Sequence, residues 1–516
     1  MINKIKLLVF LNLIVFRMFG QFNPQNDEIT KKFFPDSELD IHTPAFSKKG
    51  FTNYNDMMEY LNKLVAEHPQ EISLSFIGES QKNKKIPMVV LNKDNGKEKE
   101  KIKVWFQGGL HGDEPAGTET MLFLIDKVLN DPNYTYLLDK ITLSIVPMAN
   151  IDGYEKLDRY AANGLDLNRD QVKLMCKESN FLKKAFSDFG AEVAVDFHEY
   201  RPFRKEFGLL GTDGICSIYD AMFMYSGNLN LPQNLRDYTK NVFVGNAKKV
   251  MESNNFIFRD YIASVKHNNE VHFNQCTTEA RSSTTSYALT NCISSLIEIR
   301  GVNLQKTSFK RRINTTFLIA TSFLKTVYDD ASNIKEVLRI SNNSKPENLI
   351  VVANKPQETQ TIRAISLKDN SEISLDVKVN NAIKCTPVLE RKRPTAYLIL
   401  PEQKILVDKL IILGLKVDEL SEDKKIKVES YTVTSIRVNP DEEEGYNAQK
   451  AETSLSETEK SFPKGTFIVY LDQKNAKMAT EVLEPESENG FVKFETLKVI
   501  KNQELPIYRY LTNEKI

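Results

Sequence analysis

WFQGGLHGDEPAG, residues 105–117, is the stretch from which the rest of the chain is most readily interpreted. It follows an apolar run, residues 102–106, that predicts a buried strand, and residues 118–130 after it have the apolar periodicity of a helix. His111 and Glu114 are therefore expected on a loop at the carboxyl end of a strand, where open α/β sheets bind ligands. An imidazole and a carboxylate at this i, i+3 spacing can bind one zinc ion together.

A catalytic zinc site needs a third protein ligand and an open position for water. The chain has six histidines, so the candidates are few. His198 directly follows an apolar run, residues 191–197, that predicts another strand, whereas the remaining histidines lie in polar or helix-terminal segments. We therefore expect His198 to complete the zinc site.

Charged residues between these ligands suggest supporting roles. Asp166 is a candidate for orienting a ligand histidine, because such histidines usually donate their second ring nitrogen to a carboxylate. Asn168 and Arg169 follow it, and an arginine fork matches a carboxylate of a substrate. Arg159 offers a further cation that could polarise a carbonyl or stabilise an oxyanion.

Glu298 interrupts the apolar strand expected in SSLIEIRG. A carboxylate in a buried strand is costly unless it is paired or used in chemistry. Beside a zinc-bound water it could act as a general base and then as a general acid. The alternative is a strand-end carboxylate that pairs with Arg300.

Composition limits the possible functions. The chain has 516 residues, enough for two or three domains. Its 69 basic and 69 acidic residues balance, so nothing indicates a nucleic-acid or anionic-membrane partner. The five cysteines include no CxxC pattern and predict neither a disulfide framework nor a thiolate zinc site.

The N-terminus has the pattern of a secretory signal peptide, which we assign to residues 1–20. It predicts an exported protein, periplasmic or extracellular, and no later segment is apolar enough to span a membrane. Residues 21–50 read as an extended lead-in, and residues 51–328 as the catalytic domain. After about residue 330 the sequence pattern changes to short strands separated by polar turns, which predicts a separate accessory domain over residues 329–516.

Five motifs occur in the order and approximate spacing of the zinc carboxypeptidase family, and they cover roughly residues 50–328: HGDEPAG, the NIDGY loop, NGLDLNRD, DFHEY and LIEIRG. This part of the chain resembles that family, typified by the pancreatic carboxypeptidases. The resemblance implies an α/β fold, with a mixed eight-stranded sheet flanked by helices. The later motifs RPTAYLILPEQ and FPKGTFIVYLDQ resemble the C-terminal extension of some exported bacterial members, which we expect to form a β-rich α+β accessory domain.

The resemblance also implies a role for each site residue. One zinc ion per chain would be bound by His111, Glu114 and His198, with Glu298 as general acid and base. Arg159 matches the family's carbonyl-polarising arginine, and Asn168 and Arg169 match its clamp for the terminal carboxylate of the substrate. Tyr287 resembles the mobile tyrosine that caps the substrate, although it precedes Glu298 by a shorter interval than in the pancreatic enzymes.

The expected activity is thus hydrolysis of the C-terminal peptide bond of peptides with a free carboxylate. A zinc deacylase of the succinylglutamate desuccinylase or aspartoacylase type is an alternative, because it also uses HGxE and an Asn-Arg pair. A non-catalytic binding protein on the same fold is a third possibility. The sequence indicates neither the preferred side chain at the scissile bond nor the oligomeric state.

Overall fold

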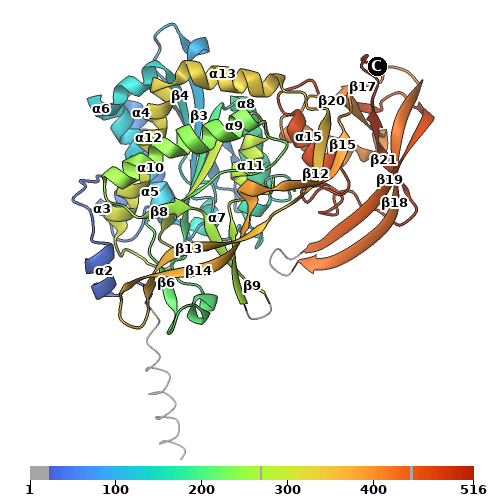
Figure 1. The fold of residues 1–516 in the computed structure, drawn as a ribbon. Helices are drawn as coiled ribbons and strands as arrows, with labels where there is room; N and C mark the ends of the chain where they lie inside the picture. The colour runs from blue at the N-terminus through green and yellow to red at the C-terminus, as the bar shows by residue number, and fades with distance from the viewer. Residues whose placement is uncertain (1–22, 268–269, 442–445) are drawn as a thin grey trace, which may run out of the picture.

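A computed structural model describes residues 23–267, 270–441 and 446–516 of the chain (Figure 1). The predicted signal peptide, residues 1–20, lies outside the described residues. Among the helices that are described, none is both long and apolar enough to cross a membrane. The five cysteines are all free and buried.

The main sheet has eight strands in the order β1-β2-β4-β3-β5-β11-β7-β8. Its centre is parallel, because β3 pairs parallel with both β4 and β5, and β5 pairs parallel with β11. The β1-β2, β2-β4 and β11-β7 pairs are antiparallel, so the predicted mixed eight-stranded sheet is confirmed. The strands are β1 Ile72–Glu79, β2 Lys85–Leu91, β3 Ile102–Gly108, β4 Ile141–Val146, β5 Val193–Tyr200, β7 Ala221–Met224, β8 Phe258–Asp260 and β11 Ile293–Arg300.

Helices cover both faces of this sheet (Figure 1). Alternate residues of a strand point to opposite faces, and on β3 the ring of Trp105 packs edge-on against Phe186, at 5.7 Å between centroids. The ring of the next residue, Phe106, packs against Phe197 instead. The helices are α4 Tyr54–Glu67, α5 Pro115–Asn130, α8 Lys177–Phe189, α10 Val244–Ser253, α11 Ser283–Ala288, α12 Phe309–Asp329 and α13 Ala331–Asn343.

Shorter elements connect these helices and strands. They are α2 Asp27–Phe33, α3 Pro44–Ser47, η1 Glu98–Glu100, α6 Pro132–Thr135, η2 Tyr136–Asp139, α7 Ile151–Tyr154, η3 Leu167–Arg169, η4 Lys205–Leu209, β6 Ile215–Ser217, α9 Gln233–Asp237, η5 Tyr238–Phe243, β9 Ile262–His267 and β10 Glu270–Gln275. The lead-in is therefore not simply extended, since it contains α2 and α3. It is also fixed to the catalytic part, because Gln25 accepts a hydrogen bond from Arg300 (2.8 Å) and donates one to Ser308 (2.7 Å).

The sheets also show that the part after residue 329 is not a separate body. Strands β13 Gln357–Ser366 and β14 Glu372–Asn381 complete a five-stranded sheet in the order β6-β13-β14-β10-β9. Three of these strands precede residue 330 and two follow it, so the predicted domain boundary runs through one continuous sheet. Sequence reasoning could not detect this, because the pairing of β10 with β14 joins segments about 100 residues apart.

The remaining C-terminal elements form the expected β-rich α+β region (Figure 1). A six-stranded sheet runs in the order β17-β20-β16-β21-β18-β19, and β12 pairs with β15. The elements are β12 Asn348–Asn354, η6 Ala382–Lys384, β15 Thr386–Lys392, β16 Ala396–Ile399, η7 Pro401–Gln403, α14 Lys404–Ile412, β17 Asp418–Glu419, β18 Lys424–Asp441, β19 Tyr446–Phe462, β20 Phe467–Tyr470, α15 Ala476–Leu483 and β21 Glu504–Tyr510.

Candidate active site

His111, Glu114 and His198 converge at the carboxyl edge of the main sheet. The first two lie on the loop between β3 and α5, and His198 lies on the neighbouring strand β5. The loop turns sharply at Gly109, whose φ of 63° suits glycine, and a Cβ there would come within 2.7 Å of the Thr118 hydroxyl. The fold thus brings together two segments that are 84 residues apart in sequence.

The donor atoms of these three residues face one another. Nδ1 of His111 lies 2.7 Å from Glu114 Oε1, and Nδ1 of His198 lies 2.9 Å from Glu114 Oε2. The two Nδ1 atoms are only 3.0 Å apart. All three side chains are buried, and their ligand atoms lie within 4.8 Å of one another.

Two carboxylates determine which ring nitrogens face inward. Asp166 Oδ1 lies 3.1 Å from Nε2 of His111, and Asp196 Oδ2 lies 2.9 Å from Nε2 of His198. The Asp166 contact is a hydrogen bond that holds the proton on Nε2 of His111 and leaves Nδ1 as an electron-pair donor. The Asp196 contact lies at ion-pair distance without hydrogen-bond geometry, and its charge favours the same tautomer of His198. Two such donors at 3.0 Å repel each other unless a proton or cation lies between them.

The electrostatics also favour a cation at this point. Burial lowers the pKa of His198, but the carboxylates of Asp196 and Glu114 outweigh it and hold the pKa well above its usual value. Two nitrogen donors, one carboxylate and a buried location form the donor set typical of catalytic zinc. The residues present therefore fit a zinc ion, with both imidazoles binding through Nδ1.

Glu298 lies beside this donor set. Strand β11 pairs parallel with β5, and Glu298 is directly opposite His198 in the register. Its carboxylate lines the cavity, where burial and the neighbouring Glu114 raise its pKa. The alternative pairing with Arg300 is not formed, because Arg300 hydrogen-bonds to Gln25 and the Ser217 carbonyl.

Arg159 reaches the same point from the loop after α7. Its Nε and Nη2 both donate to Asp166 Oδ2, at 3.1 and 2.8 Å, and these two hydrogen bonds to one oxygen orient the guanidinium group. Nη1 then lies 3.2 Å from His111 Nδ1 and 3.6 Å from Glu114 Oε1. Asp166 thus orients both a ligand histidine and the arginine.

Asn168 and Arg169 lie on η3, which Asp166 caps by accepting a 2.8 Å hydrogen bond from the Asn168 amide. Asn168 Oδ1 accepts a 2.8 Å hydrogen bond from the backbone of Ser283. Both residues line the cavity together with His111, Arg159 and Glu298.

Tyr287 is the one predicted site residue that the structure places elsewhere. Its side chain is 2% exposed, stacks on Phe186 at 4.3 Å and donates a 3.3 Å hydrogen bond to Gln107. It lies on α11 in the core and does not line the cavity, so the expected capping position is wrong for this residue.

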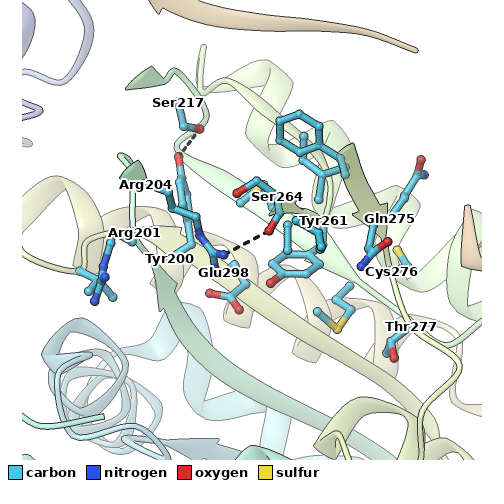
Figure 2. Close-up of a pocket in the computed structure, with 18 of the residues that line it drawn as sticks. Tyr200, Arg201, Arg204, Ser217, Tyr261, Ser264, Gln275, Cys276, Thr277 and Glu298 are labelled. Atoms are coloured by element: carbon cyan, nitrogen blue, oxygen red, sulfur yellow. Dashed lines mark hydrogen bonds between the residues drawn. The ribbon is translucent and has the colours of Figure 1, made fainter. Parts of the chain in front are cut away.

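Sequence reasoning missed two residues. Asp196 lies two positions before His198 on the same face of β5, and a carboxylate inside an apolar strand was the signal that could have identified it. Tyr261 is one of several tyrosines that line the cavity, and in the view of Figure 2 it lies between Glu298 and the Cys276-Thr277 wall. Burial and the Glu298 carboxylate raise the pKa of Tyr261 to about 12, so its hydroxyl stays protonated at neutral pH.

The cavity has a volume of about 1070 Å³, far more than one amino acid requires. Part of its wall comes from residues after position 329, namely Lys355, Ile362, Arg363, Ala364, Asn380 and Ala382. Lys355 lies 3.2 Å from Glu279 Oε1, whose carboxylate also accepts a 2.7 Å hydrogen bond from Arg281. The C-terminal part therefore helps to form the binding site.

Solved structures of similar fold are metallocarboxypeptidases. One from Burkholderia cenocepacia matches with a TM-score of 0.42 and 16% identity, covering 54% of this chain and 70% of that chain. Carboxypeptidase A from Helicoverpa armigera matches with a TM-score of 0.42 and 18% identity, covering 55% of this chain and 75% of that one.

Sequence comparisons give matches over most of the chain and others over part of it. The family model described as zinc carboxypeptidase matches residues 57–202. Carboxypeptidase 2 of Trichophyton rubrum is 30% identical over 490 residues, covering 91% of this chain and 90% of that protein. Carboxypeptidase D of Homo sapiens is 32% identical over 166 residues, 28% of this chain and 12% of that protein. The chain therefore belongs to the zinc carboxypeptidase family and is a zinc metallocarboxypeptidase.

Proposed function

We propose that this protein removes the C-terminal residue of peptides, with Glu298 as general acid and base. The main support for this proposal is the position of Glu298. It lies opposite His198 in the sheet register, beside the converging ligand atoms of His111, Glu114 and His198. His111, Glu114 and His198 would hold the zinc ion. When bound, zinc supplies a water of lowered pKa and polarises the scissile carbonyl.

The other charged residues would complete the reaction. One carboxylate oxygen of Glu298 takes the proton of the attacking water and later delivers it to the leaving amine. Its raised pKa suits both steps near neutral pH, because an acid-base group works best when its pKa is close to the operating pH. Arg159, fixed by Asp166, donates hydrogen bonds to the developing oxyanion.

Asn168 and Arg169 would bind the terminal carboxylate of the peptide. Both side chains line the cavity that also contains Glu298. We assign the capping role expected of Tyr287 to Tyr261, because its protonated phenol lies in this cavity and within electrostatic range of both Glu298 and Arg169.

The wall between the base and the clamp favours an apolar C-terminal side chain. Met222 lies opposite Glu298 in the register, and Met224 is on the same face of β7. Ser226 forms an isolated β-bridge with Thr277. The loop after Thr277 leads to Ser283, whose backbone amide donates a hydrogen bond to Asn168. Burial raises the pKa of Cys276 in this wall to about 12, so its thiol is neutral. Unbranched methionines adapt to aliphatic and aromatic groups.

Among the described residues of this wall, Met222, Met224, Cys276 and Thr277, none carries a carboxylate for a basic side chain. Glu279, which also lines the cavity, is bonded by Arg281 and Lys355. Further along the cavity, Glu206 accepts a 2.6 Å hydrogen bond from Ser264. We therefore propose that leucine, methionine or phenylalanine is released in preference to lysine or arginine.

The deacylase alternative is less well supported. It would act on a small acylated amino acid, whereas the cavity of about 1070 Å³ has room for several peptide residues. We also propose that the protein is exported, on the basis of the signal-peptide pattern in residues 1–20. N-terminal sequencing of the mature protein would test this, and retention of Met1 in the cell fraction would contradict it.

One paired measurement tests the main proposal. Zinc content is determined on purified protein, and release of C-terminal amino acids from a peptide mixture is followed for wild type and Glu298→Gln. We expect about one zinc per chain, single-residue release and an inactive variant that keeps its zinc. Equal hydrolysis of C-terminally amidated peptides would contradict the carboxylate clamp and favour the deacylase.

A further inference from the structure

A second cavity, of about 310 Å³, lies where the catalytic part meets the C-terminal part. Its walls come from residues 229–236, from the end of α13 and the residues after it, from Arg393, and from residues 471–480 at the start of α15. Figure 1 shows α13, β20 and α15 meeting in this part of the molecule. The cavity shares no lining residue with the active-site cavity.

Its lining is strongly cationic. One carboxylate, Asp472, lines it, and that group is paired with Lys515 at 2.9 Å. The cations have no carboxylate within ion-pair distance anywhere in the described ranges of the chain. They are Arg236, Lys345, Arg393, Lys474 and Lys477.

The donors at this cavity are incompletely satisfied. Lys477 Nζ makes one long hydrogen bond, 3.4 Å, to the Ser341 carbonyl. Nε of Arg236 is buried and, within the part of the chain that is described, has no hydrogen-bond partner. Burial and the neighbouring Arg393 lower the pKa of Lys477 to about 8. Arg236, Arg393 and Lys477 are half-buried, whereas Lys345 and Lys474 are exposed. Crowding half-buried like charges without a counter-charge is unfavourable, so the protein alone leaves this cavity unbalanced.

The N-terminal end of α15 adds to the positive electrostatic potential in this cavity. Ala476 and Lys477 are its first two residues and line the cavity. The side chain of the N-cap residue Asn475 does not cap the helix, because it donates to the carbonyls of Leu413 and Gly414 at 3.0 Å. The amides of Ala476 and Met478 donate to the carbonyls of Gln473 and Asn475, so this end contributes chiefly through the helix dipole, which favours an anion.

We propose that this cavity binds a small multivalent oxyanion, either free phosphate or sulfate or the phosphoryl group of a small molecule. Guanidinium and ammonium groups donate charge-assisted hydrogen bonds to such oxygens. Because the lining comes from both parts of the chain, the bound anion stabilises their junction by mass action. The inference does not depend on the proposed catalytic mechanism.

Thermal unfolding of the full-length, zinc-loaded protein tests the proposal. Phosphate and sulfate are titrated at constant ionic strength against chloride, with phosphoserine in a parallel series. Variants are Lys477→Met and, as a matched control, Lys49→Met, which removes an exposed lysine elsewhere. We expect a saturable rise of Tm with phosphate for wild type and the control. Without phosphate, Lys477→Met should unfold at a higher temperature than wild type, because a half-buried cation without a carboxylate partner is removed.

The affinity of Lys477→Met for phosphate, measured by calorimetry, should fall about tenfold or more, the ratio expected for one charge-assisted hydrogen bond. A larger response to phosphoserine than to phosphate identifies a phosphorylated molecule, and equal responses identify the free ion. Equal Tm shifts with phosphate and chloride would overturn the proposal. An undiminished phosphate response in Lys477→Met would do the same, because the anion would then be bound elsewhere, for example at the zinc site.

Discussion

Two regions of the chain form the active-site cavity, and they contribute in different ways. Residues before position 329 supply groups whose positions follow from the register of the main sheet, such as His198 and Glu298 on paired strands. Residues after it supply a wall that includes Lys355 and Ile362, with one direct ion pair, Lys355 to Glu279. The groups proposed for the chemistry are therefore positioned by the parallel strands, whereas the C-terminal part contributes to the shape of the cavity.

The buried groups of the first region are also mutually dependent. Asp166 contacts both His111 and Arg159, and Asp196 contacts both His198 and Gln107. A change in one member therefore affects the position of its neighbours. Substitutions in the main sheet should thus have larger effects than substitutions in the C-terminal wall.

Glu298→Gln should have the largest effect. The amide keeps the shape of the side chain but cannot take the proton of the attacking water, so kcat should fall by about 10²–10⁴-fold. The measurement is the steady-state release of a C-terminal amino acid. Zinc content should stay unchanged, and activity within tenfold of wild type would contradict the assignment of Glu298 as the base.

The apolar wall predicts the next largest effect. For peptides that differ only in their last residue, kcat/KM for phenylalanine or leucine should exceed that for arginine by about 10–200-fold. Thr277→Asp adds a carboxylate to the wall and retains an acceptor for the Glu279 amide, so it should reduce this ratio. Thr277→Asn is the matched neutral control and should leave it unchanged. Preferred release of arginine by the wild type would contradict the proposed specificity.

Asp196→Asn tests how the zinc ligand is oriented. The amide retains an oxygen for Gln107 but no longer holds the proton on Nε2 of His198, so zinc affinity should fall by about 10–100-fold. Competition with a chelator measures the affinity, and exposed Asp188→Asn serves as the control. An unchanged affinity would mean that Asp196 does not set the tautomer of His198.

Most of the catalytic site could be predicted from the sequence because its residues sit at strand ends. His111, Glu114, His198 and Glu298 each follow or interrupt an apolar run, and parallel neighbours bring such positions together at one edge of the sheet. Asp166 was correctly predicted to contact a ligand histidine, at 3.1 Å.

Tyr287 could not be placed correctly, because its position depends on packing that no local pattern encodes. It shares α11 with other fully buried residues and packs between Phe186 and Lys183. Tyr261 was missed because no regular sequence pattern surrounds it. It lies in a short connection between β8 and β9, where the sequence has no apolar periodicity to align.

One strand of the C-terminal part, β19, was harder to predict because most of its residues are exposed. Residues 441–460 are charged and low in apolar residues, a composition that predicts a mobile loop. The structure instead places the described ones in a long hairpin, with 441 in β18 and 446–460 in β19. Both faces of much of this hairpin are polar, and opposite charges pair across it, as between Lys427 and Glu457 at 2.6 Å. The alternation that usually reveals a strand is therefore absent.

Lys355→Met should have the smallest effect, and it tests directly what the C-terminal part contributes. Lys355 is one of two cations bound to Glu279, and its side chain is 34% exposed, so the pair is worth at most about 1 kcal/mol. The loop that carries Glu279 leads to Ser283, whose backbone amide donates a hydrogen bond to Asn168. Loss of the Lys355–Glu279 ion pair should therefore raise KM by about two- to fivefold and leave kcat unchanged. Lys368→Met, on the exposed surface of the same part, is the control. A fall in kcat instead would show that the C-terminal part acts on the chemical step, and the contrast between the two regions would have to be abandoned.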